Sequence, residues 1–239
     1  MWRDVIDIRD FYETPLGHQS QRFINTQLAR LWPDIKGQNV LGLGYAIPYL
    51  TDFLNNAARV VTTMPAKQGV LRWPPQGGSL TALVDDLNLP FQDLSFDRVI
   101  LIHALEYAEQ TRPLLREVWR ILAGSGRLIV VVPNRRGLWA RFEHTPFGHG
   151  LPYSGRQLSH ALRDNMFTPI NISRALVMPP FRSRMVQSVS SPCESISTRH
   201  FPILGGIIIA EATKQIYAGT SVNSTSRMRQ YVPFPKQSP

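Results

Sequence analysis

The chain has 239 residues, of which 43% are hydrophobic and 18% are charged, a composition that excludes global disorder. No apolar run approaches the roughly 20 residues that cross a bilayer, and the charged N-terminus lacks the apolar region of a secretory signal. We therefore expect a cytoplasmic protein with no membrane span. The single cysteine excludes a disulfide framework and any multi-cysteine metal site.

The net charge of +9 is the one unusual bulk property of the sequence. It favours acidic partners in general and says nothing about the fold. The basic residues are scattered along the chain rather than gathered in one run. Nucleic acid therefore remains one partner to consider, but the pattern does not favour it.

Apolar spacing predicts alternating helices and strands in the first half of the chain. In order, we expect a helix at residues 18–31, a strand at 40–43, a helix at 48–56 and strands at 59–63 and 81–84. Pro33 ends the first helix. Pro48 suits the start of the second, because its missing N–H would be unpaired there in any case.

The second half continues the alternation. We expect a strand at residues 98–102, a helix at 111–122, a strand at 127–132, a helix at 154–164 and strands at 170–177 and 203–212. Ser154 with Gln157 forms a capping-box pattern at the start of the last helix. Strands that alternate with helices predict an α/β fold, doubly wound around a mostly parallel sheet.

The composition changes near Gly219 to serine, threonine, asparagine, glutamine and proline. Such a segment buries too little apolar surface to offset its ordering entropy. We therefore expect residues 219–239 to form a disordered tail. Residues 1–218 are expected to form a single domain with an N-terminal helical lead-in.

The first predicted strand ends in the sequence Gly42-Leu43-Gly44. In open parallel sheets, ligands bind at the carboxyl ends of the strands. Gly44 would let a ligand approach the backbone closely, and the following helix would point N–H groups at an anion. A plain tight turn explains this short pattern equally well.

A longer series of segments lies between residues 83 and 134. It comprises DDLNLPF at 85–91, SFD at 95–97, the strand before His103, LREVWRIL at 115–122, and Gly124 and Gly126 before the strand RLIVVV. This series resembles the class I S-adenosylmethionine-dependent methyltransferases, closely over residues 83–134 and more loosely over 38–167. Residues 133–150 and the C-terminal region are also similar to a proteobacterial subgroup of uncharacterised methyltransferases.

The resemblance implies a seven-stranded Rossmann-like sheet whose last strand is antiparallel, with S-adenosylmethionine as the cofactor. Gly44 would lie beside the methionine portion of the cofactor, and Asp85 would accept a hydrogen bond from the adenine amino group. Asp86 would offer its backbone N–H to the ring edge, and Leu87 would lie near the ring face. His103 would lie where the methyl group meets its acceptor.

At two positions where the family has an acidic residue, this chain has Gly42 and Met64 instead. We include Gly42, Met64 and Tyr45 among the predicted cofactor-binding residues, because they lie near the ends of the first two predicted strands. In the family, an acid at the position of Met64 holds the ribose hydroxyls of the cofactor. Its loss weakens cofactor binding by roughly 1.5–3 kcal/mol. The main function predicted is methyl transfer, and the alternative is a non-catalytic binding or regulatory module. A nicotinamide-dependent oxidoreductase is disfavoured, because both the G-x-G-x-x-G loop and the ribose acid are missing.

His103 is the candidate general base, since an imidazole pKa near 6.5 suits proton removal at neutral pH. Packing at a strand end is the alternative role. Glu106 is expected to be a solvated or helix-entry carboxylate. We predict no metal site, because Pro146 and Gly148 separate the two histidines of residues 144–149 and keep them off a common helix face.

The loop after the strand at 127–132 carries Arg135, Arg136, Arg141 and Trp139. Arg135, Arg136 and Trp139 form the predicted substrate side, where ion pairing and stacking would hold an acidic or aromatic acceptor. A solvated basic loop is the alternative. The sequence leaves open whether the acceptor is a small molecule or a macromolecule, and which atom is methylated.

Overall fold

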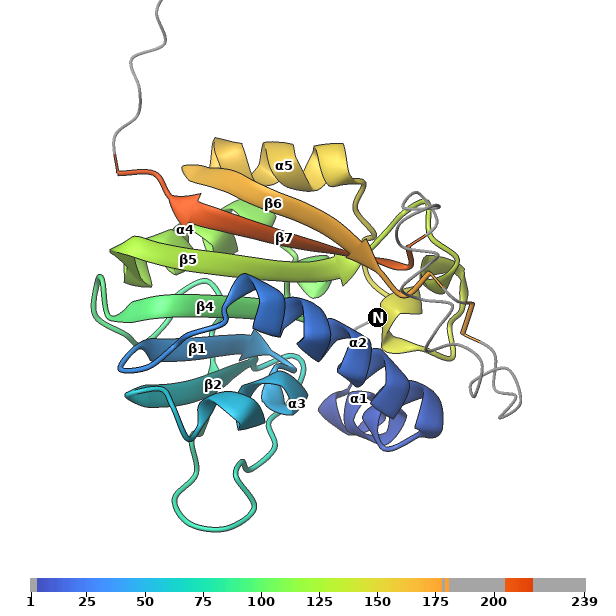
Figure 1. The fold of residues 1–239 in the computed structure, drawn as a ribbon, viewed down its shortest axis with the longest axis horizontal. Coiled ribbons are helices and arrows are strands. Elements are labelled where there is room, and N and C mark those ends of the chain that lie inside the picture. Colours follow the sequence, from blue (N-terminus) through green and yellow to red (C-terminus); the bar gives the residue numbers. More distant parts are fainter. Residues whose placement is uncertain (1–3, 178, 181–204, 217–239) are drawn as a thin grey trace, which may run out of the picture.

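A computed structural model describes residues 4–177, 179–180 and 205–216. They form one seven-stranded sheet with helices on both faces (Figure 1). The strands are β1 Asn39–Gly44, β2 Arg59–Pro65, β3 Thr81–Val84, β4 Phe96–Ile102, β5 Leu122–Pro133, β6 Phe167–Ala175 and β7 Ile207–Lys214. No helix in these ranges is long and apolar enough to cross a membrane.

The strand order in the sheet is β3-β2-β1-β4-β5-β7-β6. The neighbours from β3 to β5 are parallel, and β7 runs antiparallel to both β5 and β6. This confirms the predicted doubly wound fold with an antiparallel last strand. The order reverses between β1 and β4, and in sheets of this kind ligands bind in the crevice outside the carboxyl ends at that point.

Two apolar cores hold the helices to the sheet. The helices are α1 Val5–Tyr12, α2 Pro15–Leu31, α3 Ile47–Leu50, α4 Thr111–Ile121 and α5 Gly155–Asp164. Residues of α1, α2 and α3 pack on one face and residues of α4 and α5 on the other. Consecutive residues of β4 serve opposite cores: Ile100 and Ile102 face the first, and Val99 and Leu101 face the second. A central strand buried on both faces explains the continuous apolar run in the sequence.

Most of these elements follow from local sequence signals. The capping box at Ser154 and Gln157 is present at the start of α5. The predicted helix 48–56 is wrong in length, because α3 has a single turn and is followed by a 3-10 turn at Thr51–Phe53. The asparagines at 55 and 56 are weak helix formers, which is consistent with this early end.

The remaining differences concern the ends of elements. α2 begins at Pro15, three residues before the predicted 18. β5 begins at Leu122 rather than at 127, and Gly126 lies within it, where a β-carbon would crowd the side chain of Leu122. β6 begins three residues before the predicted 170. The first residues of the predicted strand 203–212 and the predicted tail 219–239 lie outside the described residues.

Candidate active site

The crevice at the reversal point is bounded by the ends of β1 and β4, where Gly44 is paired with Ile102. Gly44 has a φ of 85°, which favours glycine. A β-carbon at this position would overlap the carbonyl oxygen of Ile102. The need for glycine at 44 therefore arises from the close approach of two strand ends, before any ligand is considered.

The side chain of Tyr12, from the end of α1, spans this crevice. Its ring stacks on that of Tyr45 with centroids 5.6 Å apart and an interplanar angle of 20°. Its hydroxyl lies 2.7 Å from the hydroxyl of Tyr49 and 2.9 Å from Nε2 of His103. The side chain that joins the two strand ends thus comes from a helix that no motif pointed to.

His103 and Glu106 form a buried pair directly after β4. Nδ1 of His103 lies 3.3 Å from Oε1 of Glu106, and both side chains are fully buried. Within the described part of the chain, neither oxygen of Glu106 has a hydrogen-bond partner. The expectation of a solvated Glu106 is wrong, because the 3-10 turn at Leu105–Tyr107 folds under the loop after β5. A buried carboxylate is costly unless it is paired, so the imidazole is its natural partner.

Gln68, in the loop after β2, closes the crevice from the other side. Its side-chain amide donates to the carbonyl oxygen of His103 at 3.1 Å, and its backbone carbonyl oxygen accepts from the backbone N–H of Val5 at 2.8 Å. Gln68 is buried, and its Oε1 has no partner among the described residues. The loop after β2 and α1 therefore close together over the end of β4.

Burial raises the pKa of each of the three phenols of the crevice above the ordinary value of 10.0. It raises the pKa of Tyr45 to about 12 and raises the pKa of Tyr12 well above its ordinary value. The pKa of Tyr49 is raised for the same reason. The phenols are therefore neutral at neutral pH, and the hydroxyls of Tyr49 and Tyr12 form a short chain that ends at the imidazole of His103.

A separate cavity of about 190 Å³ lies at the ends of β2 and β3. It is lined by Pro65, Lys67, Asp85, Asp86, Leu87, Glu109 and Gln110. The backbone N–H of Leu87 donates to Oδ1 of Asp85 at 3.0 Å, which fixes this carboxylate at the cavity wall. Partial burial raises the pKa of Asp86. The structure thus brings together the three residues that the sequence assigned to the adenine side.

Of the predicted cofactor residues, only Asp85, Asp86 and Leu87 line this cavity, and two others are packed in the interior. Met64 is fully buried at the end of β2, next to Pro65. A β-carbon on Gly42 would meet the side chains of Ala46 and Leu50, so this position is packed against α3. Lys67, Glu109 and Gln110 were missed because they belong to no recognised segment. Lys67 and Glu109 form an ion pair beside the cavity.

Arg120 of α4 holds the segment that carries the cavity acids. It donates to the carbonyl oxygens of Leu89 and Phe91 and pairs with Glu117 and Asp93, both at 2.8 Å. The planar guanidinium makes all these bonds at once, which a lysine ammonium cannot do with the same geometry.

We expect Arg120→Ala to lower the free energy of unfolding by about 1–3 kcal/mol. The loss is modest for so many hydrogen bonds, because the side chain is partly exposed and solvent screens its ion pairs. Hydrogen bonding from Arg120 lowers the pKa of Glu117. A lowered pKa stabilises the fold above the ordinary value of 4.5, and this contribution disappears as the pH falls through the lowered pKa. Urea unfolding at pH 7 and pH 3 should show a smaller effect of the substitution at pH 3. Arg120→Lys is the matched control and should recover only part of the loss, whereas an equal loss at both pH values would contradict this role.

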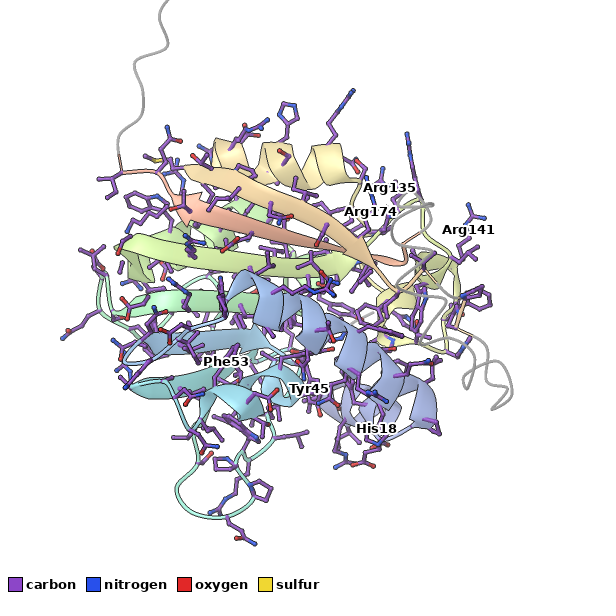
Figure 2. The ribbon with its side chains drawn as sticks, in the orientation of Figure 1. His18, Tyr45, Phe53, Arg135, Arg141 and Arg174 are labelled. Atoms are coloured by element: carbon purple, nitrogen blue, oxygen red, sulfur yellow. The ribbon has the colours of Figure 1, made fainter. Side chains whose placement is uncertain are left out.

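The predicted substrate-side residues separate into two groups. Arg135 and Arg136 are exposed, and Figure 2 shows Arg135 and Arg141 at the end of the molecule where β5 and β6 finish. Trp139 is 3% exposed, and its ring packs edge-on against Phe147 at 5.7 Å. Trp139 is therefore part of the core in this structure.

The loop that carries these residues is docked on the segment after β4. Tyr107 donates to the carbonyl oxygen of Pro146 at 2.8 Å, and the N–H of Leu151 donates to the carbonyl oxygen of Glu106 at 2.8 Å. The ring of Phe147 lies 4.8 Å from that of His103. These contacts fix the arginine loop relative to the buried pair.

The histidines of this loop bind backbone rather than one another. Nε2 of His144 lies 3.1 Å from the carbonyl oxygen of Pro180, and Nε2 of His149 lies 2.6 Å from that of Glu143. Among the residues that the structure describes, no group of three histidine, cysteine or acidic side chains is placed to hold a metal ion.

Comparisons with known proteins agree with the fold. A family model for a methyltransferase domain matches residues 41–130. An uncharacterized protein of Methanocaldococcus jannaschii is 46% identical over 52 residues, which is 22% of this chain and only 23% of that relative.

Solved structures extend the likeness over most of the chain. One is a methyltransferase from Thermotoga maritima described as S-adenosylmethionine-dependent and a possible histamine N-methyltransferase; it has a TM-score of 0.61 at 16% identity and covers 88% of this chain and 96% of that one. Another is 1,6-didemethyltoxoflavin-N1-methyltransferase from Burkholderia thailandensis, with S-adenosylhomocysteine bound; it has a TM-score of 0.55 at 15% identity and covers 88% and 85%. At these identities the likeness shows a shared fold.

Proposed function

The chain carries a methyltransferase domain with the fold of the class I S-adenosylmethionine-dependent methyltransferases, and on this premise we propose how it binds the methyl donor and where the acceptor lies. The adenine end occupies the cavity beside Asp85, the methionine end lies over Gly44, and the acceptor meets the methyl group at His103. The acceptor is a small molecule or a macromolecule, and the enzyme acts in the cytoplasm.

One observation carries this proposal: the cavity and the crevice lie next to each other at the carboxyl ends of the parallel strands. The loop that follows β2 contributes Lys67 to the cavity lining and Gln68 to the crevice. A ligand that extends from one to the other passes along the ends of β2, β1 and β4. This is the place where an open parallel sheet binds its ligands.

The adenine end fits the residues present. The cavity is smaller than the roughly 300–1,000 Å³ of a complete small-molecule site, so it suits one part of a ligand. The carboxylate of Asp85 accepts hydrogen bonds, and an adenine amino group has two to donate. Leu87 adds an apolar wall for the ring.

The methionine end fits only after two side chains withdraw. The Gln68 amide donates to the carbonyl oxygen of His103, where the ammonium group of an amino acid is an equally good donor. Tyr12 fills the space between the ends of β1 and β4. Binding therefore requires α1 and the loop after β2 to move away from the strand ends.

S-adenosylmethionine supplies a methyl group on a positively charged sulfur. The residues of this chain orient the acceptor and exclude water, because the crevice is lined by buried side chains. Met64 offers no hydrogen bond to a ribose, so we expect weaker binding than in enzymes with an acid at this position.

Replacement of the cavity carboxylate tests the proposal. We expect Asp85→Ala to weaken S-adenosylhomocysteine binding by about 1–3 kcal/mol, because the adenine amino group loses a charged acceptor. Calorimetric titration measures the change. Asp52→Ala removes an exposed carboxylate outside the cavity lining and should bind as the wild type does. Equal affinities for the two variants would contradict the assignment of Asp85.

An engineered disulfide between α1 and the loop after β2 tests whether the crevice must open. A β-carbon on Gly69 would lie 4.0 Å from that of Val5, a separation that suits a disulfide. In the Val5→Cys/Gly69→Cys variant, with Cys193→Ser, the oxidised protein should bind S-adenosylhomocysteine at least tenfold more weakly than the same protein after reduction. The reduced form is the matched control, since it carries the same backbone strain at position 69. Equal binding in both forms would show that the ligand enters without separating α1 from this loop.

The closed crevice and Met64 also support a second candidate, a binding or regulatory module without turnover. Such a module would bind S-adenosylhomocysteine but transfer no methyl group to any acceptor. The absence of heat and of a thermal shift with millimolar S-adenosylhomocysteine would instead contradict the binding proposal itself.

A further inference from the structure

Three arginines from separate parts of the sequence meet at the start of α5. Arg135, after β5, donates from Nε to the carbonyl oxygen of Pro152 at 3.3 Å. A guanidinium nitrogen of Arg174, near the end of β6, lies 3.6 Å from the position that a β-carbon on Gly155 would take. Arg156 is the next residue of α5 and is exposed. Figure 2 shows Arg135 and Arg174 together at this end of the molecule, so the fold gathers charges that are scattered along the chain.

The outer face of α5 extends this positive surface. Arg156, His160 and Arg163 follow one another at intervals of four and three residues, which places them on one face of a helix. All three are exposed, whereas Leu158 and Leu162 on the opposite face are buried against the sheet. The first turn of α5 contains no acidic residue, so the positive charge near the helix start is not balanced locally.

The three arginines also have no acidic partner elsewhere in the described part of the chain. None of the ion pairs of these residues includes Arg135, Arg156 or Arg174. By contrast, Arg120 pairs with two carboxylates. Like charges gathered without counter-charges repel one another, and a negatively charged partner relieves this repulsion. The surface therefore suits an anionic partner.

Large aliphatic side chains are exposed among these arginines. Leu151 is 62% exposed and directly precedes the residue that Arg135 contacts. Ile170 and Ile172, on the edge strand β6, are 53% and 37% exposed. A methyl group of Ile172 lies 3.8 Å from the same position beside α5 that Arg174 approaches. Guanidinium and aliphatic groups thus share one surface.

We propose that this α5 surface binds a membrane that contains anionic phospholipids; it is formed by Arg135, Arg156, Arg174, Leu151, Ile170 and Ile172. The guanidinium groups bind the lipid phosphates, whose geometry matches their planar fork. The aliphatic side chains enter the boundary between headgroups and acyl chains. The surface shares no residue with the cavity lining, so this attachment needs neither the methyl donor nor an open crevice.

Nucleic acid is the other phosphate-rich partner that arginines bind. Sites for single strands combine a basic groove with aromatic side chains on which the bases stack. Tyr153 is the aromatic residue just before α5, and it is half-buried with its hydroxyl 3.2 Å from that of Thr111. Exposed aliphatic side chains gain little beside phosphates in water, but they gain from burial in a lipid interface. The mixture of groups therefore favours a membrane.

Vesicle binding tests the proposal. The full chain is mixed with phosphatidylcholine vesicles, either pure or with about one third phosphatidylserine, and the bound fraction is measured by flotation. We expect binding to the anionic vesicles and little binding to the neutral ones. The Arg135→Gln/Arg156→Gln/Arg174→Gln variant should bind the anionic vesicles about 100-fold more weakly, because each arginine near such a surface contributes roughly fivefold.

A matched control separates this surface from net charge. Arg22→Gln/Arg30→Gln/Lys36→Gln removes the same charge from exposed positions on and after α2, which packs on the opposite face of the sheet. This control should bind within about fivefold of wild type. Thermal unfolding shows that each variant is folded; if the arginine variant is not, Arg135→Gln/Arg156→Gln, at two exposed positions, takes its place.

The aliphatic residues distinguish a membrane from nucleic acid. Leu151→Ser/Ile172→Ser should weaken binding to the anionic vesicles by about fivefold or more, while binding of a polyuridine RNA stays unchanged.

Three results would overturn the proposal. The first is binding that does not depend on phosphatidylserine, or no binding to either kind of vesicle. The second is an equal loss in the arginine variant and in its matched control, which would show that net charge alone matters. The third is wild-type vesicle binding by Leu151→Ser/Ile172→Ser together with loss of RNA binding in the arginine variant, which would assign the surface to nucleic acid.

Discussion

Gly44→Ala should destabilise the protein far more than the same substitution at another glycine with positive φ. Gly44 and Gly37 have φ values of 85° and 71°, so an alanine at either position has a left-handed backbone that costs about 1–2 kcal/mol. At Gly37 nothing lies within 4 Å of the added carbon, whereas at Gly44 the carbon overlaps the backbone of Ile102. We expect Gly44→Ala to cost about 1–3 kcal/mol more than Gly37→Ala, from this overlap.

Urea unfolding of the two variants isolates the contribution of the overlap, because the backbone strain is similar in both. Stabilities within 0.5 kcal/mol of each other would show that β1 and β4 do not approach as closely as described. The same variants should be titrated with S-adenosylhomocysteine. Weaker binding by a folded Gly44→Ala would be consistent with a methionine end that lies over this turn.

Trp139→Ala is expected to lower the free energy of unfolding by about 3–5 kcal/mol, as is usual for a buried aromatic side chain. The indole is 3% exposed, packs on Phe147, and fills the space beside Gly206, where a β-carbon would overlap the ring. Thermal or urea unfolding measures the loss. Arg135→Ala, an exposed position four residues earlier, should change stability by less than about 0.5 kcal/mol.

This pair of substitutions separates packing from ligand contact within one loop. If Trp139→Ala retains wild-type stability, the indole does not stabilise the core and regains its predicted place on the acceptor side. If both variants lose stability equally, the loop is held by interactions of Arg135 that the structure does not show. In the described structure, the exposed side chains of this loop are the three arginines and Glu143.

Several features of the fold were predictable because their causes are local. The apolar run of β4 follows from burial on both faces, and the capping box of α5 from two side chains three residues apart. Asp85, Asp86 and Leu87 are adjacent in the sequence, so their common place at one cavity follows from a single turn. The sequence pattern also indicated the glycine turn at Gly44, although not its packing reason.

The residues of the crevice were not predictable in this way. The hydroxyl of Tyr12 meets an imidazole 91 residues away, and the amide of Gln68 meets a carbonyl 35 residues away. No spacing in the chain encodes such contacts. Glu106 illustrates the limit most clearly, since its neighbours in the sequence suggested a solvated carboxylate and the loop after β5 buries it.

The sequence by itself therefore determined the order of the elements, the parallel sheet and the acidic turn after β3, because periodicity, caps and turns act over a few residues. The tertiary structure decided that α1 lies across the ends of β1 and β4, that Glu106 is buried behind His103, and that Trp139 belongs to the core. These outcomes depend on how helices and loops pack on the finished sheet. That packing is set by the shape and polarity of surfaces from distant segments, which exist only once the sheet has formed.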